Sequence, residues 1–257
     1  MQPPDTNAPF WHAIDWRRPW LAPYRANGER ACAMLDQGSP VHDAFNELAA
    51  ASGIALQGRP LMFVPHDELP AHDAYESFIF RSARVPTRGN LHDFFNALVW
   101  LAFPQVKRRL NELQAEAIKH SGVGAMRGPL RDALTLFDEN AALWWADAPL
   151  ADALAVRDWK TLFITQRGDW HGTRLVLFGH ALLEKLVAPR KPITAHVWRL
   201  PLGSTFDELV SKELDADRLV KRPWLPMPIL GVPGWWLPNE DRAFYDDATV
   251  FRQPAQP

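Results

Sequence analysis

The densest run of apolar residues in the chain covers residues 94–103. Phe94, Leu98, Leu101 and Ala102 recur there at helical spacing, and bulky apolar residues fill most of the positions between them. A helix that is apolar on nearly all sides is usually buried. Because the run is much shorter than the roughly 20 residues that span a bilayer, we expect a buried helix around which the rest of the chain is organised.

Both ends of this central helix carry clear signals. Gly89 is a turn residue, and Asn90 occupies the N-cap position with Asp93 three residues later, as in a capping box. Pro104 ends or kinks the helix at Phe103. The pattern therefore predicts that the helix begins after Asn90 and ends at Phe103.

Further helices and strands follow from the spacing of apolar residues. Helical spacing predicts helices over residues 25–37, 41–52, 74–84, 105–119, 128–145 and 206–219, and a helix that starts at His180. Short apolar runs bounded by Pro or Gly predict strands over residues 61–64, 159–166, 175–178 and 196–200. Prolines recur too closely in residues 222–236 for a helix, so this segment should be extended. We expect Lys107 to be exposed on the helix that follows Pro104.

This order of elements predicts an α+β fold, with helices dominating and a small, mostly antiparallel sheet. No internal repeat and no linker divides the chain. We therefore expect a disordered tail over residues 1–9 and a single globular domain over residues 10–257.

Composition narrows the class of protein. Hydrophobic residues make up 47% of the chain and charged residues 23%, which is typical of a globular domain. A net charge of −2 argues against a dedicated nucleic-acid-binding protein. A single cysteine, Cys32, excludes an intrachain disulfide and a multi-cysteine zinc site. The first residues lack the basic and apolar parts of a signal peptide, so we expect a cytoplasmic protein that does not associate with membranes.

Four stretches stand out together: PTRGNLHDFFNALVWLAFP, LFDEN, FGHALLEK and FYDDATVFR. With them the chain resembles, from Leu61 to Arg252, an uncharacterised bacterial family catalogued as domain of unknown function 3025. The resemblance implies a single cytoplasmic domain from a bacterium. It implies no activity and no catalytic residues.

Histidines and carboxylates gather on three of the predicted helices. The candidate metal ligands are His92, Asp138, His180 and Glu184, and the candidate catalytic residues are Arg88, Asp93 and Glu139. His180 and Glu184 are one helical turn apart, a spacing that suits metal ligation or a histidine oriented by a carboxylate. Mixed His and carboxylate ligands suit zinc, manganese or iron.

The first functional hypothesis is a metal-dependent enzyme of the hydrolase class. A divalent metal with an open position would activate water, and Arg88 would hold an anionic substrate by a bidentate contact. The structural alternative is that Asp93 completes a capping box while His92 and Asn96 satisfy a buried loop carbonyl.

Two other functions stay open. The 12 tryptophans and 23 prolines would allow a non-enzymatic domain whose Trp/Pro-rich loops bind a small molecule or a protein. Asp158–Trp159–Lys160 at the start of a predicted strand, with Asp138 upstream, weakly resembles the acidic pattern of metal-dependent nucleases. The sequence leaves the substrate, the metal and the oligomeric state open.

Overall fold

The computed structural model describes residues 8–121, 128–206 and 209–253 of the chain. They form two compact units, one up to Leu134 and the other from Thr135. Helix α6 (Pro129–Asn140) contributes residues to both units. The expected single domain stays a prediction, and the expected tail lies outside the described residues as far as residue 7.

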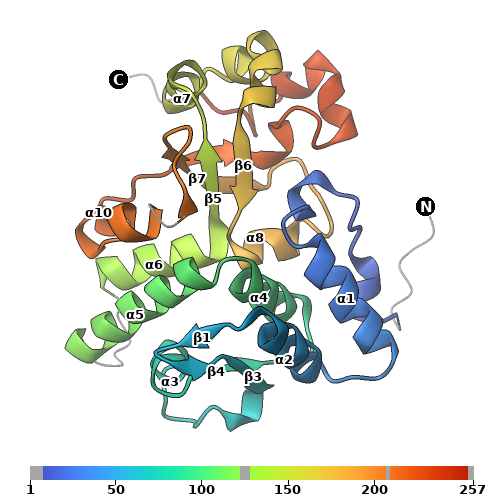
Figure 1. Ribbon diagram of the computed structural model, residues 1–257. Coiled ribbons are helices and arrows are strands. Elements are labelled where there is room, and N and C mark those ends of the chain that lie inside the picture. Colours follow the sequence, from blue (N-terminus) through green and yellow to red (C-terminus); the bar gives the residue numbers. More distant parts are fainter. Residues whose placement is uncertain (1–7, 122–127, 207–208, 254–257) are drawn as a thin grey trace. The chain divides into compact units, whose positions relative to one another are not determined.

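The first unit is mainly helical (Figure 1). Its helices are α1 (Arg25–Asp36), α2 (Val41–Ser52), α3 (Tyr75–Ser82), α4 (Leu91–Ala102) and α5 (Pro104–Ser121). These bounds agree with the predicted helices to within about two residues. No helix in the described part of the chain is both long enough and apolar enough to cross a membrane.

Two small pairs of strands complete the first unit. β1 (Ala55–Leu56) pairs with β2 (Arg59–Pro60) in antiparallel fashion. β3 (Met62–Pro65) pairs in parallel with β4 (Arg84–Thr87), and this pair packs against α2 and α3. The predicted strand at residues 61–64 therefore exists, but it does not belong to the larger sheet.

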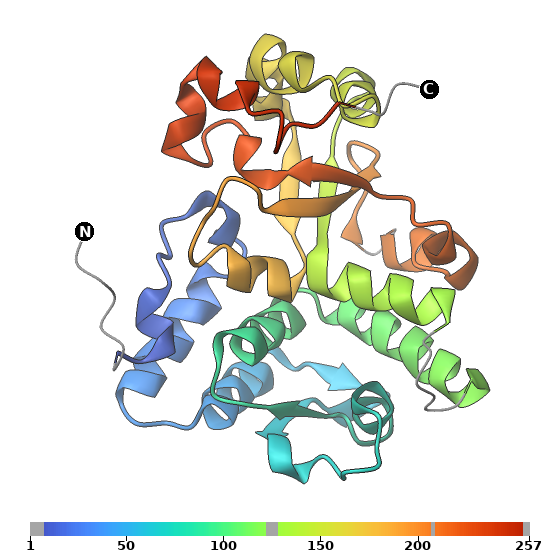
Figure 2. The same ribbon diagram turned by 180° about the vertical axis from the view of Figure 1, so that it is seen from behind.

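The second unit is built on a four-stranded sheet. Its strands are β5 (Ala141–Trp145), β6 (Arg174–Leu177), β7 (Thr194–Leu200) and β8 (Leu225–Pro228), in the spatial order β6–β5–β7–β8. β5 is parallel to β7 and antiparallel to β6, and β8 runs antiparallel beside β7 (Figure 2). The short helices α7 (Ala148–Ala155), α8 (His180–Lys185) and α10 (Ala216–Val220) belong to the same unit.

Three of the predicted elements that reach into this unit are wrong in whole or in part. The helix predicted over residues 128–145 ends at Asn140, and Ala141–Trp145 is the fully buried strand β5. A strand buried on both faces reads as a continuous apolar run, and spacing alone does not distinguish it from a buried helix. The helix predicted over residues 206–219 consists in its described part of a π-helix, Leu209–Glu213, and α10, because Asp215 interrupts the run and caps α10.

The strand predicted over residues 159–166 is also helical. Thr161–Thr165 forms a turn of π-helix, with Leu162 and Phe163 buried. Asp158 starts this turn, because its carboxylate accepts hydrogen bonds from the amide and the hydroxyl of Thr161, at 3.0 and 2.7 Å. The hydrogen bonds of the Asp158 side chain favour the helical conformation of this segment, and the spacing of apolar residues does not reveal such a cap.

The expected extended course of residues 222–236 is correct only as far as Pro228, because Ile229–Gly231 forms a 3-10 turn. After β8 the chain continues through 3-10 turns towards an aromatic cluster of the second unit. In this cluster Phe163 stacks on Tyr245, with ring centroids 5.4 Å apart, and Trp159 donates a hydrogen bond to the carbonyl of Arg252 at 2.9 Å. Residues near position 250 thus complete the core around residues 159–170.

Candidate functional site

In the first unit Arg88 and Asp93 bind each other. Asp93 Oδ2 accepts hydrogen bonds from the main-chain amide of Arg88 at 2.7 Å and from its Nε at 2.9 Å. Asn90 caps α4 by accepting from the amide of Asp93 at 2.8 Å. The side chain of Asp93 is 6% exposed and that of Arg88 is 56% exposed. Asp93 therefore ties the preceding turn to α4, and Arg88 is the member of the pair that solvent reaches.

A buried polar cluster extends from α4 to α5. Asn96 donates to the hydroxyl of Tyr75 at 3.1 Å and accepts from Lys107 Nζ at 2.9 Å. Lys107 Nζ also lies 5.3 Å from the centroid of the Trp100 ring, a cation–π contact. His92 lies half-buried in the first turn of α4.

The expectation that Lys107 is exposed is wrong. Its exposed fraction is 4%, and Asn111 and Gln114 follow it on the same buried face of α5. Positions spaced by four and three residues share one face of a helix. Because three residues on that face of α5 are polar, apolar spacing alone does not predict that the face is buried.

In the second unit Asp138 and His180 meet. The Nδ1 of His180 lies 2.8 Å from the main-chain carbonyl oxygen of Asp138 and 3.6 Å from its carboxylate Oδ2. Their side chains are 6% (His180) and 15% (Asp138) exposed. A carbonyl oxygen only accepts, so Nδ1 carries the proton of the neutral ring. The pair joins the end of α6 to the start of α8.

Gly179 explains how these two segments come so close. The main-chain amides of Phe178 and Gly179 both donate to the carbonyl of Ala141 at 2.9 Å. A Cβ atom at Gly179 would lie 2.5 Å from the main chain of Glu139 and Asn140. Only glycine fits this approach, because real Cβ atoms do not come so near to backbone atoms.

A second histidine, His196, flanks the same start of β5. It lies opposite Ala141 in the parallel pairing with β7. The amide Nδ2 of Asn140 donates to His196 Nδ1 at 2.7 Å and to the carbonyl of Thr194 at 3.1 Å. Burial, together with the positive charges of Arg222 and Lys185, lowers the pKa of His196 below its ordinary value.

The other two predicted site residues of this unit lie nearby in sequence. Glu139 and Glu184 are half-buried, the first on α6 beside Asp138 and the second one turn after His180 on α8. Among the predicted residues, the second unit thus brings Asp138 and His180 into direct contact. Arg88, His92 and Asp93 belong to the first unit.

The chain offers few preassembled metal ligands. Over residues 8–121, 128–206 and 209–253, no group of three or more His, Cys, Asp or Glu side chains is placed to hold a metal ion. The nuclease-like triplet also has another role, because Asp158 caps the turn at Thr161 and a helical segment follows it.

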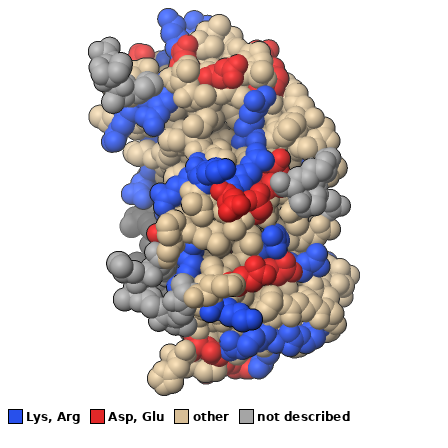
Figure 3. All heavy atoms as spheres, turned by 90° about the vertical axis from the view of Figure 1, so that its left-hand side faces the viewer, with Lys and Arg blue, Asp and Glu red and all other residues tan. Residues whose placement is uncertain are grey.

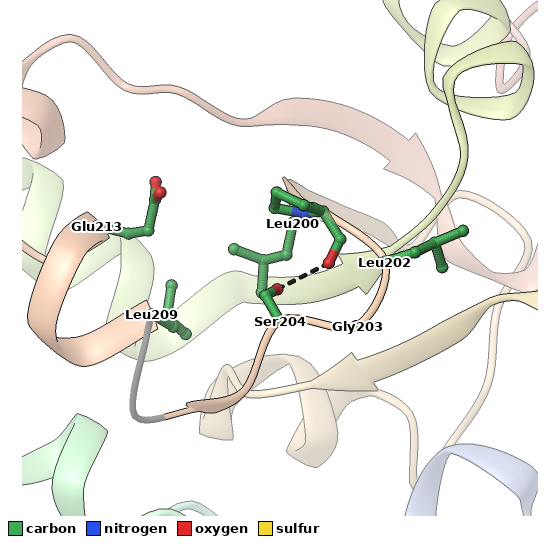
Figure 4. A pocket seen from close by; sticks show the side chains of 7 residues that line it. Leu200, Leu202, Gly203, Ser204, Leu209 and Glu213 are labelled. Carbon is green, nitrogen blue, oxygen red and sulfur yellow. Dashed lines mark hydrogen bonds between the residues drawn. The ribbon is translucent and has the colours of Figure 1, made fainter.

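A cavity of about 380 Å³ lies beside the loop that follows β7. Figure 4 shows Ser204 and Glu213 at its wall, with the Ser204 hydroxyl bonded to the carbonyl of Pro201 at 2.7 Å. Glu213 forms an ion pair with Arg218. Ser204 also accepts hydrogen bonds from Trp145 Nε1 of β5, so the polar groups of this cavity bind other residues of the second unit.

These contacts define an α+β protein with a buried histidine–carboxylate pair at the junction of a helix and a mixed sheet. The chain belongs to the family described as "protein of unknown function (DUF3025)", whose model matches residues 61–255. The matched range includes Asp138, His180 and His196. No curated protein and no solved structure matches the chain.

Proposed function

We propose that the protein is a hydrolase in which His180 is the general base and Asp138 positions it. The observation that supports this proposal is the 2.8 Å hydrogen bond between His180 Nδ1 and the main-chain carbonyl of Asp138. With the proton held on Nδ1, the lone pair of the neutral ring belongs to Nε2. That form of histidine accepts a proton from water.

The Asp138 carboxylate has a second effect. Its Oδ2 lies 3.6 Å from His180 Nδ1, so its negative charge stabilises the ring once the ring has become positive. Both side chains are largely removed from solvent, and a lower local dielectric strengthens this attraction. Asp138 is therefore a positioning residue, since it acts through His180.

The proposed reaction is the attack of water on an ester carbon or phosphorus. His180 Nε2 takes one proton from the water while the water oxygen forms the new bond. The ester oxygen then leaves with that proton, so that an acid and an alcohol result and His180 returns to its neutral form. No electrons are gained or lost.

The metal-dependent form of the proposal uses the same lone pair. A histidine that donates its other N–H to a carbonyl is the usual arrangement of a metal ligand. Elemental analysis of untagged protein, purified without chelator, distinguishes the two forms. Zinc, manganese or iron that is lost in His180→Gln supports a metal site. Protein that stays metal-free after incubation with these ions assigns proton transfer to His180 alone.

The test of catalysis uses three chromogenic probes: p-nitrophenyl acetate, p-nitrophenyl phosphate and bis(p-nitrophenyl) phosphate. We expect turnover of at least one probe, with kcat/KM lower by about 10²- to 10⁴-fold in His180→Gln. Asp138→Asn keeps the main-chain carbonyl and should lower kcat by about 10- to 100-fold with little change in KM. His171→Gln and Asp152→Asn change exposed residues of the same unit and should match the wild type.

Two results would contradict the proposal. One is the absence of turnover for all three probes. The other is a rate in His180→Gln equal to that of the wild type, with circular dichroism showing that the variant is folded.

The alternative of a binding domain with Trp/Pro-rich loops has less support. All 12 tryptophans are buried or half-buried, and Trp144 and Trp170 stack on each other with ring centroids 5.0 Å apart. The loops thus direct their rings towards the protein interior, which leaves little aromatic surface for a partner.

A further inference from the structure

A groove of about 540 Å³ lies between α3 and α5 in the first unit. Small side chains leave it open where the two helices face each other, namely Ala74 at the N-cap of α3, Ser77 on α3 and Ala115 on α5. Phe80 and Ile118 give it apolar walls. Small-molecule sites are typically concave, mostly apolar and of this size.

Two charges of opposite sign stand at the rim of this groove. Glu116 and Lys119 lie three residues apart on α5, and both are exposed. Neither side chain has an ion-pair partner within the described part of the chain. By contrast, Asp73 and Arg81 at the same rim bind each other at 2.6 Å.

A buried acceptor close to the groove also lacks a partner. Asn111 is 1% exposed, its Nδ2 donates to Glu76, and its Oδ1 has no hydrogen-bond partner among the described residues. It lies one helical turn before Ala115, which lines the groove. Asn111 does not line the groove, so a buried water, and not a ligand in the groove, would satisfy this acceptor.

We propose that this groove binds a free amino acid with a large apolar side chain. The side chain covers the apolar walls, the ammonium group pairs with Glu116, and the carboxylate pairs with Lys119. An α-amino acid carries both charges on adjacent atoms of one small group. This matches two unpaired charges that are neighbours on one helix face. The site is independent of the His180–Asp138 pair.

Three probes with the same ring separate the contributions of the two charges. L-phenylalanine carries both charges, 3-phenylpropionate only the carboxylate, and 2-phenylethylamine only the ammonium group. We expect isothermal calorimetry on the full chain to give a Kd for L-phenylalanine on the order of 1 mM. The affinity of each singly charged probe should be lower by about threefold to fivefold, as expected for one exposed ion pair.

Variants of the protein assign each charge. In Lys119→Ala, L-phenylalanine should bind no better than 2-phenylethylamine, whose own affinity should not change. In Glu116→Ala, L-phenylalanine should bind no better than 3-phenylpropionate, whose own affinity should not change. Lys221→Ala removes another exposed lysine at the end of a helix and should have no effect.

Filling the groove gives the second arm of the test. Ala115→Leu should abolish binding of all three probes, whereas Ala50→Leu, at an exposed position of α2, should bind like the wild type. If Ala115→Leu fails to fold, Ser77→Leu narrows the groove from its opposite wall. The proposal is wrong if L-phenylalanine shows no saturable binding at tenfold above the expected Kd. It is also wrong if the three probes bind equally, or if the folded filled variant binds like the wild type.

Discussion

His196 keeps a neutral ring against the side chain of Asn140. The amide Nδ2 donates to Nδ1 of the ring at 2.7 Å, while Asn140 Oδ1 is buried and has no hydrogen-bond partner among the described residues. A proton on Nδ1 would bring two donors face to face. Rotating the amide would instead turn its oxygen towards the carbonyl of Thr194, which Nδ2 now contacts at 3.1 Å. This contact therefore agrees with burial in lowering the pKa of His196.

The shift predicts a pH dependence of stability. In the unfolded chain His196 takes up a proton near its ordinary pKa of 6.5, whereas in the folded chain it does so only at a lower pH. The free energy of unfolding should therefore decrease as the pH falls through about 6.5, and it should be restored as the pH rises. Urea denaturation at about pH 7.5 and 5.5 measures this decrease, which should be smaller in His196→Gln. Equal decreases in both proteins would contradict the prediction.

Single residues also show how far the sequence could predict the candidate site. Asp138 and His180 are found because each stands out in a local motif. Asn140 and His196 are not found from the sequence, because their contact requires β5 to pair with β7, more than 50 residues later in the chain. A helix over residues 128–145, which the apolar spacing predicts, excludes that pairing.

Among the elements, α4 depends most clearly on a local signal. Asn90 accepts a hydrogen bond from the amide of Asp93, and Asp93 in turn holds Arg88. Asn90→Ala should lower the free energy of unfolding by about 1 kcal/mol, which is typical of a lost N-cap. Asn90→Asp keeps a capping oxygen and should stay close to the wild type. Thermal unfolding followed by circular dichroism compares the three proteins, and equal stability of Asn90→Ala would argue against the cap.

The elements differ in how well local patterns predict them. In the first unit, Asn90 caps α4, Pro104 separates α4 from α5, and Gly53 ends α2 in the left-handed conformation. The bounds of these helices follow from such local signals in the sequence. The bounds of β5 and β8 do not follow from local signals, since both strands depend on pairing with β7. An all-apolar run such as residues 141–145, or a proline-rich one such as residues 225–228, becomes a strand only when its neighbours in the sheet are in place.

On the scale of the whole molecule, the net charge is small, and positive and negative side chains are mixed on the surface. The net charge is −2, and Figure 3 shows Lys and Arg side chains interleaved with Asp and Glu over the face it draws. Binding to duplex DNA at physiological salt should therefore be weaker than about 10⁻⁴ M. Fluorescence anisotropy with a labelled duplex tests this. Tight binding that weakens steeply with added salt would show a basic surface that the charge balance does not reveal.

The order of the strands has a consequence for biosynthesis. The strand pairs of the first unit, β1–β2 and β3–β4, are complete once residue 87 has been made. In the second unit β5 can pair with β7 only after residue 200 has been made, and β7 with β8 only after residue 228. The hydrogen bond from Trp159 to the carbonyl of Arg252 forms later still. While the ribosome is still translating residues 146–200, β5 lacks one or both of the strands that flank it, β6 and β7. Nascent chains of the second unit should therefore depend more on chaperones than those of the first.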